Sequence, residues 1–377
     1  MSVALLVGLV ACGQDSIASL PEGTLFTSVT VGAFHSCALD QNSIAYCWGS
    51  NTSGQLGIES ERSRTPVPTP VAGGPVFRSL DAGRAHTCGV TLLNEIWCWG
   101  ANGDGQLGDG THESRDAPVA LQSGGRFALV SAGVGHTCAL DYQGRASCWG
   151  RNNRGQLGTG TTVSQVRPTG VVGDQRFSSI SSGALHTCAV SVGAVAYCWG
   201  DNEAGQLGTG APSGHARPVP LDAAQHTFRS VTAGFSHTCG LTRVGEALCW
   251  GSDDRGELGN GETGDRRTPS PVSGGHFFSE VVTGTSPWSC GILRAGEVHC
   301  WGTNGSGIFG AERLVALEPL PATAKTGGEW QGLAVGDGHL CAVEDDGIAY
   351  CWGSGGSGQL GDGASSDSDV PVPVQGL

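Results

Sequence analysis

One short motif occurs seven times in this chain at a nearly constant spacing, and this repetition constrains the fold more than any other feature. In each copy two cysteines stand ten residues apart, and successive copies follow after 50 or 51 residues. The pairs are Cys37 and Cys47, Cys88 and Cys98, Cys138 and Cys148, Cys188 and Cys198, Cys239 and Cys249, Cys290 and Cys300, and Cys341 and Cys351. A strict period of this length is typical of repeat proteins, in which each unit buries its apolar side against its neighbours.

Each cysteine pair is expected to lie in a β-hairpin. When the third copy is folded so that Cys138 faces Cys148, Leu140 faces Ala146 and a three-residue loop, 142–144, remains. Such loops favour a left-handed residue at their last position, and five of the seven copies carry Gly or Asn there. Alternation along the ladder places the cysteines at a non-hydrogen-bonded position, where the two backbones approach closely enough for the sulfurs to bond.

The cysteine count predicts an oxidising compartment. Fifteen cysteines divide into the seven pairs and Cys12, and such regular pairing is typical of a disulfide framework. One alternative is zinc, but each hairpin supplies only two thiols and no clustered further ligands. Another alternative is reduced cysteines that only fill the core. In the loop-entropy model, each ten-residue ring adds roughly 2 to 3 kcal/mol of stability.

Four strands are predicted in every unit. A strand that starts at an aromatic residue and ends at Gly, such as Phe26 to Gly32, is followed by the two hairpin arms and by a proline-marked stretch such as Pro66 to Pro68. Proline cannot donate to a ladder, so the fourth strand is expected at an edge. Seven units of four antiparallel strands predict an all-β, seven-bladed β-propeller over residues 26–377.

Two ways of closing the ring are compatible with the sequence. In one, every blade is contiguous and the ring closes by packing. In the other, the C-terminal stretch Pro371 to Val374 supplies the missing edge of the first blade, so that the termini interlock.

Composition excludes several classes of function. The 64 glycines favour short strands and tight turns over long helices. A formal charge of −14 repels phosphate backbones, and no basic run is longer than Arg266-Arg267, so we predict no nucleic-acid partner. The sequence contains no Walker loop and no GxGxxG after a predicted strand, and we expect no cofactor.

Residues 1–12 form an apolar run that ends in Leu-Val-Ala-Cys and resembles a bacterial lipoprotein signal. This resemblance implies lipidation at Cys12, with residues 13–25 as a short tether and a lipid anchor as the only contact with a membrane. The positive charge that opens a secretory signal is absent. The alternative is a flexible N-terminus. With the disulfides, the segment predicts an extracytoplasmic protein of the bacterial cell envelope, lipid-anchored or secreted.

The repeat resembles that of the regulator of chromosome condensation (RCC1) family. The matching pattern is Gly-x-x-His-(Ser/Thr)-Cys-Ala-Leu followed by Cys-Trp-Gly-x-Asn-x-x-Gly-Gln-Leu-Gly, and it covers Phe26 to Leu377. The resemblance implies the propeller fold independently. It also implies candidate activities: guanine-nucleotide exchange on a small GTPase, inhibition of a β-lactamase, or, as in plant ultraviolet receptors, light sensing. Light sensing requires tryptophans beyond the repeat, and only Trp97, Trp288 and Trp330 are additional.

A histidine stands two residues before the first cysteine in six of the seven units. These are His35, His86, His136, His186, His237 and His339. A ring of imidazoles could bind a metal ion or an anion around the axis. The interpretation adopted is a repeated hydrogen bond that ties each blade's backbone, because the histidine belongs to the repeat.

Unit six departs most from the repeat and is the predicted contact patch. Its unusual residues Trp288, Ile308, Phe309 and Arg313 are expected at the surface, where exposed apolar side chains mark interaction sites; sequence drift is the alternative. No catalytic triad is recognisable. We therefore predict a monomeric, non-enzymatic scaffold whose loops bind a protein or glycan partner. The alternatives are a secreted enzyme inhibitor, a guanine-nucleotide exchange regulator and a hydrolytic enzyme.

Overall fold

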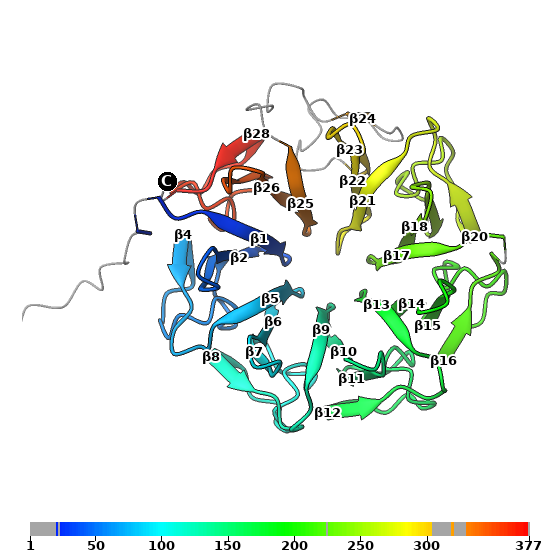
Figure 1. Ribbon diagram of the computed structural model, residues 1–377, viewed down its shortest axis with the longest axis horizontal. Helices are drawn as coiled ribbons and strands as arrows, with labels where there is room; N and C mark the ends of the chain where they lie inside the picture. The colour runs from blue at the N-terminus through cyan, green and yellow to red at the C-terminus, as the bar shows by residue number, and fades with distance from the viewer. Residues whose placement is uncertain (1–19, 22, 224, 304–317, 320–328, 376–377) are drawn as a thin grey trace, which may run out of the picture.

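Seven β-sheets surround a central axis in the computed structural model (Figure 1). The structure describes residues 20–21, 23–223, 225–303, 318–319 and 329–375. Each sheet has four antiparallel strands in sequence order, from the innermost strand beside the axis to the outermost strand at the rim. No helix in these ranges is long and apolar enough to span a bilayer. The predicted seven-bladed β-propeller is confirmed.

The four strand positions recur in every blade. The innermost strands are β1 (Phe26–Val31), β5 (Phe77–Ala82), β9 (Phe127–Ala132), β13 (Phe177–Ser182), β17 (Phe228–Ala233), β21 (Phe278–Thr283) and β25 (Trp330–Val335). The second strands are β2 (His35–Asp40), β6 (His86–Thr91), β10 (His136–Asp141), β14 (His186–Ser191), β18 (His237–Thr242), β22 (Trp288–Leu293) and β26 (His339–Glu344). The third strands are β3 (Ala45–Ser50), β7 (Ile96–Gly100), β11 (Ala146–Gly150), β15 (Ala196–Gly200), β19 (Ala247–Gly251), β23 (Val298–Gly302) and β27 (Ala349–Gly353). The outermost strands are β4 (Arg64–Pro70), β8 (Arg115–Ala120), β12 (Gln165–Gly170), β16 (His215–Pro220), β20 (Arg266–Pro271), β24 (Glu318–Pro319) and β28 (Ser368–Pro373).

The ring closes by packing between contiguous blades. Strands β1–β4 form one sheet and β25–β28 form another, so the C-terminal strand completes its own blade. The interlocked arrangement is therefore wrong. The proline-marked strands occupy the outer edge as expected, because that position leaves one side of the strand without ladder partners.

The hairpins have the predicted register. Cys138 pairs with Cys148 and Leu140 with Ala146. The last loop residue has a positive φ in every hairpin, including Ser43 and Ala194, both at 64°. The hairpin geometry therefore overrides the local preference of these two side chains.

All seven predicted cysteine pairs are bonded across their hairpins, with Cα atoms 4.0 to 4.1 Å apart. Each bridge joins the second strand of a blade to the third, and every one of these cysteines is fully buried. The bridges join Cys37 to Cys47, Cys88 to Cys98, Cys138 to Cys148, Cys188 to Cys198, Cys239 to Cys249, Cys290 to Cys300 and Cys341 to Cys351. Neither alternative, zinc ligation or reduced core cysteines, matches this arrangement.

Hydrophobic contacts between consecutive blades build the core. Where the structure describes it, the loop after a third strand carries Gly-Gln-Leu-Gly or Gly-Glu-Leu-Gly and covers the tryptophan of the next blade. Trp99 Nε1 donates to the carbonyl of Gln55 at 2.9 Å, and Leu56 is fully buried against the same indole. The same contact closes the ring, because Trp48 Nε1 of the first blade donates to Gln359 O of the last at 2.9 Å.

Candidate functional site

The six repeat histidines form hydrogen bonds between blades. His35 Nε2 lies 2.9 Å from Thr87 Oγ1 in the next blade, and the last member, His339, lies 2.9 Å from Ser36 Oγ in the first. The equivalent distances for the other four are 2.8 to 2.9 Å. The predicted repeated hydrogen bond thus exists, but it joins side chains of neighbouring blades and does not tie a blade to its own backbone.

These histidines are neutral donors. The Thr87 hydroxyl donates its hydrogen to the carbonyl of Gln55 at 3.0 Å, so its oxygen accepts the hydrogen bond that the His35 Nε2–H group donates. Burial lowers the pKa of His35 to about 3 and that of His86 to about 4, and the other four fall in the same range. In the described part of the chain, no three His, Cys, Asp or Glu side chains come together as a metal site. The ring of imidazoles therefore holds the blades together.

Of the predicted contact patch in unit six, the structure describes only Trp288, and this residue is buried. Trp288 is 1% exposed, because it occupies the buried histidine position of its blade and donates Nε1 to Gly336 O at 3.0 Å. Leu340 replaces the threonine opposite it, so an apolar pair substitutes for the hydrogen-bonded pair between blades six and seven. Ile308, Phe309, Arg313 and the lipidation candidate Cys12 lie outside the described residues.

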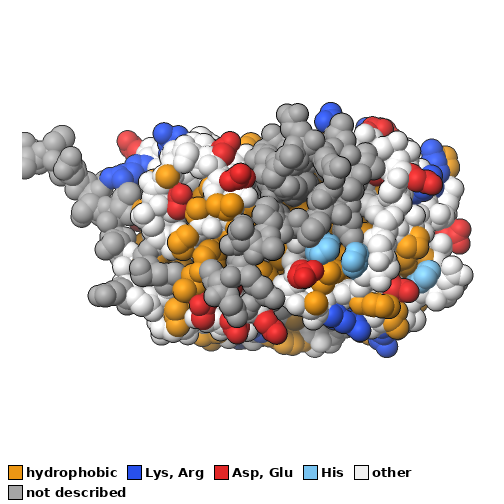
Figure 2. All heavy atoms as spheres, turned by 90° about the horizontal axis from the view of Figure 1, so that it is seen from above, with side chains coloured by type: hydrophobic (Ala, Val, Ile, Leu, Met, Phe, Trp, Pro, Cys, Tyr) orange, Lys and Arg blue, Asp and Glu red, His pale blue; other side chains and the backbone are white. Residues whose placement is uncertain are grey.

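The two flat faces of the disc are built from different loops. One, here called the hairpin face, carries the loops between second and third strands and the connections between blades. These segments adjoin, since Phe77 N donates to Ser43 O and Phe127 N donates to Asn94 O. The opposite loop face carries the turns between first and second strands and the long loops before the outermost strands. Edge-on, the disc shows hydrophobic and charged side chains intermixed (Figure 2).

Exposed apolar side chains gather on the hairpin face. Of thirteen large hydrophobic residues that are exposed in the described structure, nine lie in its loops and connections. The nine are Ile44, Val76, Leu92, Leu93, Tyr142, Val192, Val195, Val244 and Phe277. Leu93 and Val192, at hairpin tips, are 66% and 67% exposed. A face with this many apolar tips is a candidate protein-binding surface.

Among the described residues of the hairpin face, the permanently charged cations are all arginines, and most lack an acidic partner. Seven lie there: Arg78, Arg126, Arg145, Arg176, Arg229, Arg243 and Arg294. Within the described residues only Arg145 has a carboxylate within 4.0 Å, on Asp141. Two others cover exposed rings, since Arg78 lies 5.8 Å from the centre of Tyr142 and Arg294 lies 5.6 Å from the centre of Phe277.

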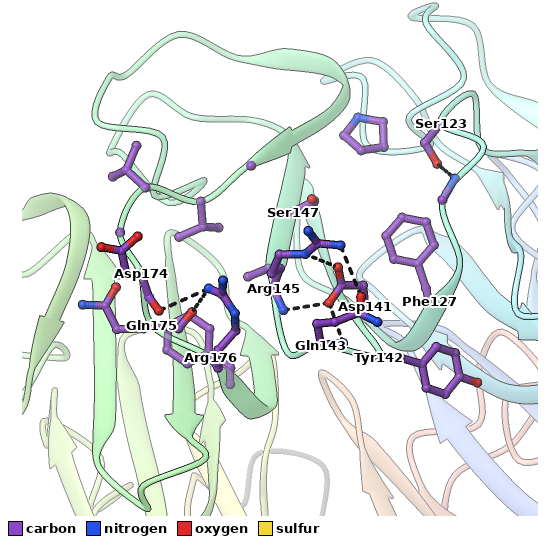
Figure 3. Close-up of a pocket in the computed structure, with 18 of the residues that line it drawn as sticks. Ser123, Phe127, Asp141, Tyr142, Gln143, Arg145, Ser147, Asp174, Gln175 and Arg176 are labelled. Carbon is purple, nitrogen blue, oxygen red and sulfur yellow. Dashed lines mark hydrogen bonds and ion pairs between the residues drawn. The ribbon is translucent and has the colours of Figure 1, made fainter.

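A groove of about 700 Å³ crosses the hairpin face at the third blade. The hairpin 142–145 forms its centre, and segments 123–126 and 171–176 form its walls. Figure 3 shows Arg145 with Asp141 in the hairpin and Arg176 on the wall beside it. Three arginines and two aspartates line the groove, so its formal charge is positive although the whole chain carries −14.

Asp141, one of the two aspartates of the groove, is already engaged within its hairpin. Asp141 accepts the backbone N–H groups of Gln143 and Arg145 at 2.9 Å, and Arg145 Nε at 2.5 Å. Partial burial acts to raise the pKa of Asp141, but these bonds outweigh it and lower the pKa overall. The charges left over are those of Arg126 and Arg176 and the opposite charge of Asp174 on the wall, so the groove stays positive.

The central channel is a second concavity, of about 940 Å³, lined by the innermost strands. Each of its two carboxylates accepts a hydrogen bond from a backbone N–H group on the innermost strand of the next blade. Asp81 accepts from Ala132 N at 2.7 Å, and Glu280 accepts from Leu333 N. Burial raises the pKa of Asp81 to about 6 and that of Glu280 to about 7, despite these bonds. Both acids are engaged in holding the ring, so the hairpin face remains the better candidate site.

The repeat does not mark the hairpin tips as a site, because their spacing determines only the turn. The available signal was the apolar residues in loops that favour polar ones, such as Leu92-Leu93 and Val192.

Three family-model matches agree on one protein family. The family model of the RCC1-like domain matches residues 71–377, and two matches to the regulator of chromosome condensation (RCC1) repeat cover residues 26–55 and 44–90. Among curated proteins, the ultraviolet-B receptor UVR8 of Arabidopsis thaliana is 35% identical over 153 residues, 40% of this chain and 34% of the receptor. The human E3 ubiquitin-protein ligase HERC2 is 30% identical over 42% of this chain but only 3% of its own length. These matches thus span about a third or less of the relatives.

Solved structures share the propeller. Human WBSCR16 superposes with a TM-score of 0.78 at 21% identity, covering 88% of this chain and 94% of that one. Yeast RCC1 (Prp20), bound to Kap60, superposes with a TM-score of 0.76 at 18% identity, covering 100% and 89%. The ectodomain of the Arabidopsis thaliana receptor kinase ACR4 gives 0.58 at 21% identity, covering 93% and 100%. At these identities the likeness establishes the fold alone.

Proposed function

The chain belongs to the RCC1-like domain family, and from this premise we propose that it is a non-enzymatic scaffold whose hairpin face binds a protein partner. The gathering of nine exposed hydrophobic side chains on that one face carries the proposal. Burial of such tips against a partner would supply the apolar centre that stable protein interfaces share.

Rigidity supports the same role. Each blade carries an internal disulfide, and five blades are tied to the preceding one by a bond from the tryptophan Nε1 to the carbonyl of a glutamine. The hairpin tips are therefore held in one surface before a partner arrives. A preorganised surface loses little conformational entropy on binding. The same fold in yeast RCC1 (Prp20) was solved bound to a protein, Kap60.

The seven disulfides support an extracytoplasmic location, since such bonds persist in oxidising compartments. Presentation on a bacterial envelope, with a lipid at Cys12, stays part of the proposal. Nucleotide exchange on a small GTPase fits less well, because such a partner is cytosolic and disulfides persist in oxidising compartments. A secreted inhibitor is the special case in which the partner is an enzyme.

Site-specific cross-linking tests the proposal. A photoreactive residue is placed at Val192 on the hairpin face and, as matched control, at Val163 on the loop face, which is 63% exposed. We expect one reproducible adduct from position 192 and none from 163. With that partner purified, the double substitution of Leu93→Asp and Val192→Asp should weaken binding at least about tenfold, equivalent to about 1.4 kcal/mol. Binding that is sensitive to Val163→Asp and indifferent to the double variant would place the interface on the loop face and overturn the proposal.

A further inference from the structure

We propose that the groove of the third blade binds an acidic, extended segment of the protein partner, with carboxylates placed on Arg126 and Arg176. This inference rests on the proposed protein-binding function and adds the chemical class of the partner. It follows from the charge distribution, the anchoring of the two arginines and the apolar residues that border the groove.

Ion pairing differs between the two faces. On the loop face Arg115, Arg151, Arg154 and Arg266 pair with carboxylates of this chain, while others in the described ranges, such as Arg84 and Arg255, do not. On the hairpin face six of seven arginines have no such partner within the described residues. A chain of formal charge −14 has ample acid to neutralise them. Because these guanidinium groups are not engaged by carboxylates of this chain, they are available to carboxylates of a ligand.

Both arginines of the groove are anchored in a way that leaves donors available. Arg176 Nη1 donates to the carbonyl oxygens of Asp174 and Gln175, each at 3.2 Å. Arg126 Nη1 donates to the carbonyl of Leu93 in the neighbouring hairpin. Neutral carbonyls orient each guanidinium without cancelling its charge, and Nη2 of both residues has no partner among the described residues. Oriented guanidinium groups are suited to bidentate carboxylate binding.

The surroundings favour a peptide over a glycan or nucleic acid. Leu93 and Val192 adjoin the two arginines, since Arg126 donates to Leu93 O and Val192 N donates to Arg176 O, and both side chains are well exposed. A ligand with apolar side chains as well as charge would therefore bury them. Tyr142, the exposed aromatic ring of the groove, is already covered by Arg78 and donates to Asn94 Oδ1 at 2.5 Å. It is therefore not free to stack on a sugar or base.

Fluorescence anisotropy with defined probes tests the inference. The probe is a labelled peptide in which Glu alternates with Val, and its control has Gln in place of Glu. We expect the Glu peptide to bind and the Gln peptide to bind at least about tenfold more weakly, a difference of the size that charge-assisted pairs produce. Arg126→Gln with Arg176→Gln should remove this preference, whereas Arg84→Gln, an exposed arginine of the loop face, should preserve it.

Several outcomes would refute the inference. Equal binding of the two peptides, absence of binding by the Glu peptide, or an unchanged preference in the double arginine variant would each do so. So would tighter binding of a polygalacturonate oligomer or a DNA oligonucleotide at the same arginines. The two proposals can be tested separately. If Leu93→Asp with Val192→Asp abolishes binding of the cross-linked partner while the arginine variant does not, the protein-binding function is supported and the acidic ligand is refuted.

Discussion

His35 in the first blade donates Nε2–H to Thr87 Oγ1 in the second at 2.9 Å, and that hydroxyl donates onward to Gln55 O. The pair is fully buried, so removing one partner leaves the other unsatisfied. Thr87→Val should lower the free energy of unfolding by about 1 to 3 kcal/mol. Thr87→Ser, which keeps the hydroxyl, is the matched control and should lose less. Urea unfolding followed by circular dichroism measures both; equal stability of the valine variant and the wild type would contradict a bonded pair.

Between blades six and seven the same positions hold Trp288 and Leu340, and the two should be energetically coupled. Trp288→His alone removes buried ring volume and places an imidazole against a leucine, at a cost of roughly 3 kcal/mol. Adding Leu340→Thr restores the hydrogen-bonding pair found elsewhere in the ring. A double-mutant cycle should therefore give a favourable coupling of about 0.5 to 3 kcal/mol. Additive losses would show that the two residues contribute independently to stability.

Acid should unfold the protein steeply. The six ring histidines have pKa values lowered from 6.5 to about 3 or 4 by burial. Between pH 6.5 and 4 the unfolded chain binds protons that the folded chain does not, so stability falls as the pH falls. Each histidine contributes about 1.4 kcal/mol per pH unit in this window. Unfolding free energies measured from pH 7 to 4.5 should reveal the uptake of several protons; uptake of one or fewer would show that the imidazoles titrate in the folded ring.

Glu280 should act in the opposite direction. Burial raises its pKa from 4.5 to about 7, so the folded state holds a proton that the unfolded state has lost, and stability falls as the pH rises from 4.5 to 7. Glu280→Gln keeps an acceptor for Leu333 N without the charge. The variant should gain stability over the wild type across this interval, as thermal unfolding at a series of pH values would show. Glu246→Gln, at an exposed hairpin position, is the control and should run parallel to the wild type.

All seven bridges should be present in the native protein. Alkylation in denaturant without reductant should modify none of the fourteen paired cysteines, and alkylation after reduction should modify all of them. Replacing Cys138 and Cys148 together by serine should cost about 2 to 3 kcal/mol in the loop-entropy model. Fourteen freely reactive thiols in the native protein would remove the argument for an oxidising compartment.

The repeat alone was sufficient to predict the number of blades, the hairpin register and the cysteine pairing. These properties depend on contacts within one copy: the ten-residue cysteine spacing determines which residues face each other, and proline excludes its strand from a central position. Because the pattern occurs seven times, every copy supports the same strand assignment.

Contacts between copies required the tertiary structure. The sequence shows a histidine in six of the units but not that His35 reaches Thr87, about fifty positions later, because this depends on how one blade packs on the next. Trp288 was expected at the surface because its type departs from the repeat, yet packing buries it beside Leu340. The hairpin face likewise emerged only when the ring brought distant turns such as Leu93 and Val192 onto one side, since a face is a property of the closed disc and not of any single repeat.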